Sequence, residues 1–239
     1  KALLSVVFSV SNSENRVELT GVLFSFSENK LNLVATDSYR LAEREITLKN
    51  NGAKNEQKII VPAKTVQELL RVLNNIEVGE NAEDQEIKFY LSENQILFTF
   101  DSVEIISRLI NGHYPDYKQI IPAKSQTTVL VERLELVRAV KAAALFSKTG
   151  INDITILFSH GKLIVSSFSG ASGESQIELG ADVKGIDNEV TINFRYLLDG
   201  LNNIEGDMVR LEILNNTTPC VLRPEKENNY LYIVMPIRQ

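Results

Sequence analysis

The stretch Ala-Thr-Asp-Ser-Tyr-Arg-Leu-Ala, residues 35–42, is the most informative part of this chain. It follows the apolar run Leu31–Ala35, and its Asp-Ser pair is typical of a turn after a strand, because short polar side chains bond their own backbone there. Tyr39, Arg40 and Leu41 then place an amphipathic ring, a planar cation and an aliphatic side chain next to one another at a strand edge. That combination is typical of a peptide-binding pocket rather than of a catalytic one.

Around this octapeptide, apolar and polar residues alternate, which predicts β-strands joined by short turns. We expect strands at Val17–Thr20, Gly21–Phe24, Leu31–Ala35, Ile87–Leu91, Ile96–Phe100, Ile154–Phe158, Leu163–Val165, Val209–Leu214 and Pro219–Leu222. The Gly-rich segment Ser169–Glu174 opens no helix and is expected to be a loop between strands.

Four other segments have the periodicity of helices. Apolar residues at spacings of three, four and seven predict a helix with one apolar face at Ala63–Leu73. The same pattern recurs at Phe194–Ile204, after Asn193, a residue type preferred at the N-cap. Val131–Phe146 is a longer Ala-rich helix, and Ala2–Val10 reads as the remnant of its counterpart, so the chain is expected to begin inside a helix.

The order helix, strand pair, strand, helix, hairpin, strand therefore occurs twice. One copy covers residues 1–122 and the other covers 129–239, with the polar connection 123–128 between them. Each copy is large enough to be a domain. We therefore expect two tandem α+β domains, each with antiparallel sheets and helices on one face.

Composition narrows the class of protein. The chain has 239 residues, a formal net charge of −6 and one cysteine. No apolar run approaches the roughly 20 residues of a membrane span, so we expect no membrane partner. A single cysteine, Cys220, fits a reducing compartment, expected to be the cytoplasm, and reads best as a buried residue of its strand.

The sequence contains no catalytic constellation. Its two histidines, His113 and His160, are far apart and read as surface turn residues, and neither metal-ligand spacings nor phosphate-binding glycine loops are present. We therefore expect no enzyme activity, no cofactor and no metal. A compact enzyme whose active site is assembled between the two repeats stays open as an alternative.

Positive charge falls on the polar sides of the helices. The candidates for a DNA-facing role are Lys64, Arg71, Arg138, Lys141, Lys148 and Arg195. If these helices face one cavity, their cations would form a weak, sequence-independent field for phosphates, which favours sliding over gripping. The alternatives are ordinary solvated helix faces with ion pairs along the helix, and a module that grips nucleic acid directly.

Four segments, in order, resemble the bacterial DNA polymerase sliding clamps, the β subunit of DNA polymerase III. The octapeptide is similar to the family signature ATD-[SG]-[HY]-RLA, and Arg16–Phe24 is similar to the strand pair that opens the middle domain. Ser107–Tyr117 resembles the family's [KR]-L-[IV]-[DEN]-G-x-[FY]-P-D-Y segment, and Tyr232–Arg238 resembles its terminal strand. The resemblance covers the middle and C-terminal domains of the family.

The resemblance implies a function. Clamps are processivity factors that form a head-to-tail homodimer ring around duplex DNA and tether the replicative polymerase. It also implies that clamp loader and repair proteins dock through short peptides. Leu145 and Phe146 would belong to the interface with a second protomer, or would be core residues of their helix.

The resemblance further implies a hydrophobic groove between the two domains that takes the docking peptides. The matching positions are Leu19, Thr36, Ser38, Tyr39, Arg40, Leu41, Pro115, Ile120, Val234, Met235, Pro236 and Arg238. Aliphatic walls would accept the apolar anchors of a peptide, while arginine and backbone groups would orient it. Leu19 and Met235 could instead be plain core residues.

Overall fold

The structure is a computed structural model that describes residues 1–49, 56–75 and 86–238. The chain divides into two compact units. The first unit comprises Lys1–Ser38 and Glu43–Pro115, and the second comprises Tyr39–Ala42 and Asp116–Gln239. The octapeptide is thus shared: its turn belongs to the first unit and its Tyr-Arg-Leu-Ala half to the second.

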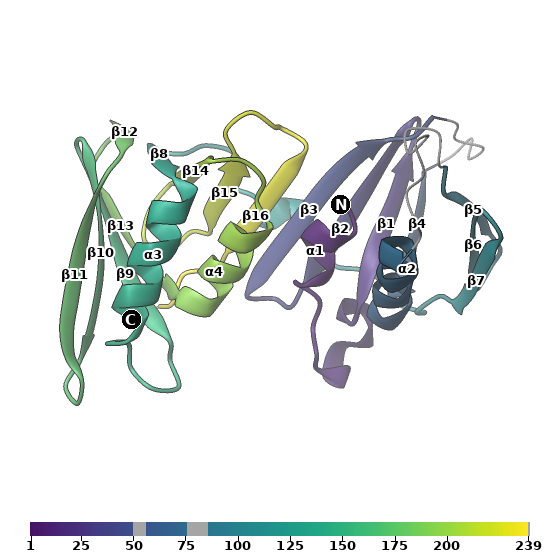
Figure 1. The fold of residues 1–239 in the computed structure, drawn as a ribbon, viewed down its shortest axis with the longest axis horizontal. Coiled ribbons are helices and arrows are strands. Elements are labelled where there is room, and N and C mark those ends of the chain that lie inside the picture. Colours follow the sequence, from purple (N-terminus) through teal and green to yellow (C-terminus); the bar gives the residue numbers. More distant parts are fainter. Residues whose placement is uncertain (50–55, 76–85, 239) are drawn as a thin grey trace. The chain divides into compact units, whose positions relative to one another are not determined.

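The first unit is built on an antiparallel sheet in which the strands follow the order β3-β2-β1-β4 (Figure 1). Its strands are β1 (Gly21–Ser27), β2 (Lys30–Thr36), β3 (Arg40–Thr47, of which 40–42 belong to the second unit) and β4 (Gln57–Pro62). The hairpin register pairs Leu23 with Val34 and Phe26 with Leu31. All four side chains are buried, and because Leu23 and Phe26 are three residues apart they point to opposite faces, so both faces of the hairpin are covered.

A second, three-stranded sheet completes the first unit. It consists of β5 (Lys88–Leu91), β6 (Gln95–Phe100) and β7 (Val103–Arg108). Phe24 packs edge-on against Phe98 with ring centroids 6.4 Å apart, and Phe26 lies 5.3 Å from Phe89, so aromatic contacts join the two sheets. The helices α1 (Leu4–Val7) and α2 (Ala63–Asn75) contact each other and strand β1.

The second unit repeats this plan with larger sheets (Figure 1). One sheet has the order β12-β8-β14-β15-β16 and the other β11-β10-β9-β13. The bounds are β8 (Thr127–Glu132), β9 (Asp153–Ser159), β10 (Lys162–Ser169), β11 (Gly173–Gly180), β12 (Asp182–Gly185), β13 (Asn188–Asn193), β14 (Met208–Ile213), β15 (Cys220–Pro224) and β16 (Tyr230–Val234). All the recorded pairings are antiparallel.

Two helices of the second unit lie side by side in Figure 1 and pack on each other. They are α3 (Arg133–Ala144) and α4 (Phe194–Asn203). The Asn193 side chain accepts a hydrogen bond of 2.9 Å from the Arg195 N–H, which confirms the predicted N-cap. Gly200 lets α4 approach β16 closely, because a Cβ there would lie 2.2 Å from the Tyr232 ring.

The predicted α+β class with antiparallel sheets is confirmed. The order of helices and strands recurs, although more strands precede the second helix of each unit than the pair and single strand expected: β1 to β4 in the first unit and β9 to β13 in the second. Three local predictions are confirmed. A turn follows at the Asp-Ser pair, a loop follows Ser169, and Cys220 is buried in a strand. Within the described residues, no helix is long and apolar enough to cross a membrane.

Several predicted boundaries were wrong. Residues Glu14–Leu19 form a 3₁₀ helix, η1, rather than a strand, because side chains satisfy its ends: Ser13 Oγ accepts from Asn15 N–H and Thr20 Oγ1 donates to the Val17 carbonyl. Helix α3 begins at Arg133, because Val131 and Glu132 pair with β14.

Two further segments are shorter than predicted. The first helix spans only Leu4–Val7 rather than Ala2–Val10. The backbone after it makes a turn, in which the Ser9 N–H donates to the Val6 carbonyl at 3.0 Å, and then meets η1, where the Ser11 N–H donates to the Leu19 carbonyl at 2.9 Å. The connection 123–128 is shorter than expected because Thr127 and Thr128 already pair in the sheet, and the two units divide at Pro115–Asp116.

Candidate peptide-binding site and basic helix faces

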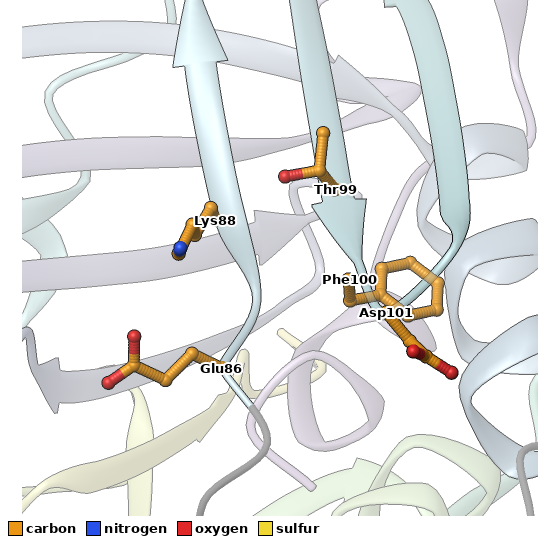
Figure 2. A pocket seen from close by; sticks show the side chains of 5 residues that line it. All are labelled: Glu86, Lys88, Thr99, Phe100 and Asp101. Carbon is orange, nitrogen blue, oxygen red and sulfur yellow. The ribbon is translucent and has the colours of Figure 1, made fainter.

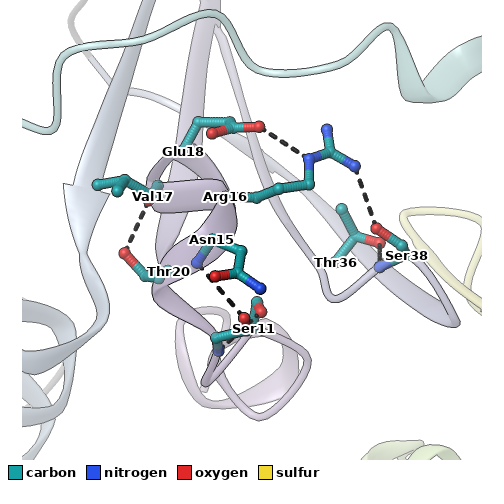
Figure 3. Close-up of polar contacts among 9 residues, drawn as sticks. Ser11, Asn15, Arg16, Val17, Glu18, Thr20, Thr36 and Ser38 are labelled. Carbon is teal, nitrogen blue, oxygen red and sulfur yellow. Dashed lines mark hydrogen bonds and ion pairs between the residues drawn. The ribbon is translucent and has the colours of Figure 1, made fainter.

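The turn of the octapeptide is held by side chains of the first unit (Figure 3). Ser38 adopts a positive φ of 79°, and its N–H donates to Thr36 Oγ1 at 3.1 Å. Its own hydroxyl accepts a 3.2 Å hydrogen bond from Arg16 Nη1. The turn is therefore fixed from two sides in a conformation that non-glycine residues seldom adopt.

Arg16 is oriented in turn by Glu18. Arg16 Nε donates a 2.9 Å hydrogen bond to the Glu18 carboxylate, which Figure 3 shows beside the guanidinium. Backbone hydrogen bonding, and then the Arg16 guanidinium, lower the pKa of the Glu18 carboxyl below its ordinary value. Glu18 thus stays charged at neutral pH and keeps Arg16 aimed at the turn.

The other predicted residues of the first unit are less accessible. Leu19 and Thr36 are buried, and Pro115 is half-buried. Next to Pro115, the Tyr114 hydroxyl donates to the Val34 carbonyl at 3.4 Å, and burial raises the pKa of Tyr114 above its ordinary value. Leu19 is therefore as buried as a core residue. This agrees with the alternative role as a plain core residue given in the sequence analysis.

The second half of the octapeptide belongs to the second unit and pairs with its last strand. The Met235 N–H donates a 2.8 Å hydrogen bond to the Tyr39 carbonyl. The Tyr39 ring is 63% exposed and stacks on Tyr196 of α4, with centroids 6.2 Å apart and planes at 16°. An exposed aromatic face is therefore held in a defined orientation.

Arg40 is the most enclosed cation of this region. Its guanidinium forms an ion pair with Asp199, and its Cζ lies 4.9 Å from the centroid of the Tyr196 ring. Its side chain is only 12% exposed. Burial raises the pKa of Tyr232 well above its ordinary value, and the nearby Arg40 partly opposes that rise.

The remaining predicted groove residues differ in exposure. Leu41 and Val234 are fully buried, Met235 and Pro236 are half-buried, and Ile120 and Arg238 are exposed. Pro236 forms an isolated bridge with Ile192, and the Ile237 N–H donates to the Thr191 carbonyl at 2.7 Å. The tail after β16 is thus attached to strand β13 of its own unit.

The predicted DNA-facing cations all lie exposed on or next to helices. Two of them are matched by carboxylates one turn earlier: Arg71 pairs with Glu68 on α2, and Arg138 pairs with Glu135 on α3. The Glu68 carboxylate raises the pKa of Arg71. These ion pairs weaken the positive electrostatic potential of both helices. The arrangement therefore fits an ordinary solvated helix surface as well as it fits a surface that faces phosphates.

Leu145 and Phe146 follow the last turn of α3. Leu145 is 76% exposed, so it is not a core residue of its helix, whereas Phe146 is half-buried near Gly173 at the start of the edge strand β11.

A hollow outside the predicted site lies on the small sheet of the first unit. It is lined by Glu86, Lys88, Thr99, Phe100 and Asp101, and Figure 2 shows the two carboxylates pointing away from each other. Among the residues that the structure describes, no group of three or more histidine, cysteine, aspartate or glutamate side chains is placed to hold a metal.

Sequence reasoning missed the residues that support the octapeptide. These are Arg16 and Glu18 in the first unit, and Tyr196, Asp199 and Tyr232 in the second. One signal was present: Tyr196 and Asp199 are three apart in a predicted helix and so share a face. Nothing in the sequence indicated which residue that face would meet.

Within the described residues, two tandem α+β units, each with two antiparallel sheets and two α-helices, define the DNA-clamp or processivity-fold class. The model of the DNA polymerase III beta subunit central domain matches residues 1–116, and that of its C-terminal domain matches residues 118–238. The chain belongs to the DNA polymerase III beta subunit family.

Individual relatives agree with this assignment. The beta sliding clamps of Staphylococcus epidermidis and Staphylococcus aureus are 31% and 33% identical over 233 residues, which is 97% of this chain and 59% of theirs. A sliding clamp structure from Pseudomonas aeruginosa matches with a TM-score of 0.92 at 26% identity, over 100% of this chain and 63% of that one. A Thermotoga maritima beta subunit structure matches at 0.91 and 28%, over 100% and 62%. The chain therefore spans about three fifths of the length of these relatives.

Proposed function

We propose that this chain is the peptide-docking and DNA-facing part of a DNA sliding clamp, a non-catalytic processivity factor of the replicative polymerase. Family membership and the names of the relatives support this role. Within it, residues 1–122 serve as the middle domain and 129–239 as the C-terminal domain. The cytoplasm is the compartment that goes with replication of a bacterial chromosome.

The observation that carries the proposal is the arrangement of the second half of the octapeptide. Tyr39 offers an exposed ring braced by Tyr196, and Arg40 offers a fixed planar cation beside it. The Tyr39 carbonyl also accepts a hydrogen bond from the Met235 N–H, which ties this segment to the tail after β16. Aromatic and arginine side chains on a rigid support are the residues that most often dominate peptide binding.

We propose that the predicted groove residues accept short clamp-binding peptides of the polymerase, the clamp loader and repair proteins. The exposed members, Tyr39, Ile120 and Arg238, are the first contacts in this proposal, and Met235 and Pro236 supply apolar walls. The buried members, Leu41 and Val234, act by supporting those walls. The apolar anchors of a QLxLF-type peptide suit such a surface.

The remaining roles belong to the same proposal. Lys64, Arg71, Arg138, Lys141, Lys148 and Arg195 face duplex DNA and act without reading bases. Leu145 and Phe146 contribute to the contact with a second protomer in the complete ring. Net charge of −6 fits topological tethering better than tight gripping of phosphates.

Calorimetric titration with a QLxLF-type peptide tests the docking role. We expect one binding site in the wild-type chain and at least about tenfold weaker binding in Tyr39→Ser, because an exposed aromatic anchor is lost. Tyr90→Ser is the matched control, since Tyr90 is 58% exposed on β5 of the first unit and is not a groove residue. Absence of binding to the folded wild-type chain, or equal loss in both variants, would overturn the proposal.

A further inference from the structure

Asp199 lies on helix α4 at the point where Arg40 is held. We propose that Asp199 is a positioning residue that fixes the Arg40 guanidinium, and with it the cationic part of the peptide site. This inference rests on the proposed docking function. Asp199 acts through Arg40 and does not itself need to touch the peptide.

The exposures of the two partners differ sharply. The Arg40 side chain is 12% exposed, whereas that of Asp199 is 48% exposed. A largely desolvated guanidinium is costly without a charged partner, while a half-exposed carboxylate keeps much of its hydration. Removal of the Asp199 charge would therefore release Arg40 toward water rather than leave it in place.

Several groups restrain the Arg40 guanidinium, among them the Tyr232 side chain, which hydrogen-bonds it. Its Nη1 donates to the Asp199 carboxylate, and its Cζ lies 4.9 Å from the centroid of the Tyr196 ring. Tyr196 and Asp199 are three residues apart, so one helix face supplies both the ring and the carboxylate. A planar, delocalised cation can use both partners at once, which a lysine ammonium cannot do in the same way.

Helix α4 gives these two side chains a rigid base. The Tyr232 hydroxyl donates a 2.7 Å hydrogen bond to the Tyr196 carbonyl, and the Asn203 amide donates to the Asp199 carbonyl at 2.9 Å. Close packing at Gly200 joins the same helix to β16. The support is thus built into the fold, as a preorganised site requires.

The ring of Tyr196 links Arg40 to its neighbour. The same ring that lies against the Arg40 guanidinium stacks on the exposed Tyr39. Freeing Arg40 would therefore loosen one of the contacts around Tyr196 and affect the orientation of Tyr39. A single charge on α4 would in this way organise both polar and aromatic parts of the site.

Nitrogen NMR of the Arg40 guanidinium tests the positioning step without any peptide. We expect slow rotation of the guanidinium in the wild type and faster rotation in Asp199→Asn, in which the Tyr196 ring and the Tyr232 hydrogen bond remain but the charged partner is lost. Asp182→Asn is the matched control, because Asp182 pairs with Lys184 at 3.6 Å on β12 and the change in charge is the same. Identical Arg40 signals in the wild type and Asp199→Asn would overturn the inference.

Peptide titration tests the functional step. We expect about 5- to 30-fold weaker binding of the QLxLF-type peptide by Asp199→Asn, which loses the charge-assisted bond, and by Arg40→Lys, which loses the planar cation that uses both partners at once. The double variant should have about the same peptide affinity as the single variant that binds more weakly, because both changes disrupt the same Arg40–Asp199 interaction. Asp199→Glu, which keeps the charge, should stay within about threefold of the wild type.

The failures of the two claims are distinguishable. A wild-type chain that binds no peptide overturns the docking function, while the NMR measurement still decides whether Asp199 fixes Arg40. Full peptide affinity in Asp199→Asn, together with a freed Arg40, overturns the inference alone. Additive losses in the double variant would also contradict it.

Discussion

The main-chain N–H of Met235 donates a 2.8 Å hydrogen bond to the carbonyl oxygen of Tyr39. Two segments almost 200 residues apart in sequence therefore lie side by side within the second unit. This bond explains why the octapeptide changes units at Ser38–Tyr39. Its turn packs with the strands that precede it, while its Tyr-Arg-Leu-Ala half completes the surface around β16.

Gly200→Ala should destabilise the protein. An added Cβ would lie 2.2 Å from the Tyr232 ring, so either α4 or β16 must move. We expect a loss of about 2–4 kcal/mol in the free energy of unfolding, from overpacking and from weakening of the Tyr232–Tyr196 bond. Urea unfolding measures this. Gly170→Ala, where nothing lies within 4 Å, should stay within about 0.5 kcal/mol of the wild type.

Ser38 offers a test of the octapeptide turn. Its φ of 79° favours glycine. In Figure 3 its hydroxyl has one hydrogen bond, which it accepts from the exposed Arg16. Ser38→Gly should therefore be about 1 kcal/mol more stable than Ser38→Ala, because both lose the hydroxyl but only glycine relieves the left-handed conformation. Equal stabilities in thermal unfolding would show that the turn is not strained.

Three buried groups predict loss of stability in alkali. Burial raises the pKa of Cys220 from 9 to about 12, and also raises the pKa values of Tyr114 and Tyr232. Between pH 9 and 12 the unfolded state loses the thiol proton and the folded state keeps it. The stability supplied by the protonated thiol is therefore complete below pH 9 and is lost as pH rises toward 12.

Urea unfolding between pH 8 and 11 measures this dependence. Each such group adds up to about 1.4 kcal/mol per pH unit to the decrease in the free energy of unfolding. In Cys220→Ala this free energy should therefore decrease less steeply and begin to decrease nearer pH 10. Thiol labelling gives an independent check: Cys220 should react only after unfolding. Rapid labelling of the folded chain at pH 8 would contradict the burial.

The ion pairs on the helices predict how DNA binding responds to charge. Glu68→Gln and Glu135→Gln free Arg71 and Arg138, so each should strengthen weak binding to linear duplex DNA by about two- to threefold at low salt and steepen its salt dependence. Fluorescence anisotropy measures both. Glu178→Gln on the edge strand β11, which frees Lys162 of β10, is the control with the same change in charge.

If Glu178→Gln strengthens DNA binding as much as the helix variants do, net charge alone is responsible and the helices have no special role. Tight, steeply salt-dependent binding by the unaltered chain would instead favour a module that grips DNA directly.

Local patterns predicted most of the fold. Alternation and turn chemistry located the hairpins around Leu31–Ala35 and Ile154–Val165, and heptad-like spacing located α2 and α4. The segment Val17–Thr20 was misread because four residues are too few to distinguish strand alternation from a short 3₁₀ helix, whose ends are closed here by side chains of Ser13 and Thr20.

The supports of the candidate site could not be predicted. Arg40 and Asp199 are 159 residues apart, and neither carries a local signal for the other. The octapeptide showed which side chains gather at one turn, whereas the identity of their partners depends on long-range packing. Arg16 illustrates the same limit at short range, since its contact with Ser38 follows from an irregular backbone inside η1.

The central claim is that the surface around Tyr39, Arg40 and Met235 takes clamp-binding peptides. Chemical-shift mapping by NMR during addition of a QLxLF-type peptide tests this most directly. We expect the amide signals of these three residues and of Ile120 to shift in a saturable way, with little change at the helix cations. Shifts concentrated instead at the hollow formed by Glu86 and Asp101, or on helices α2 and α3, would contradict the account.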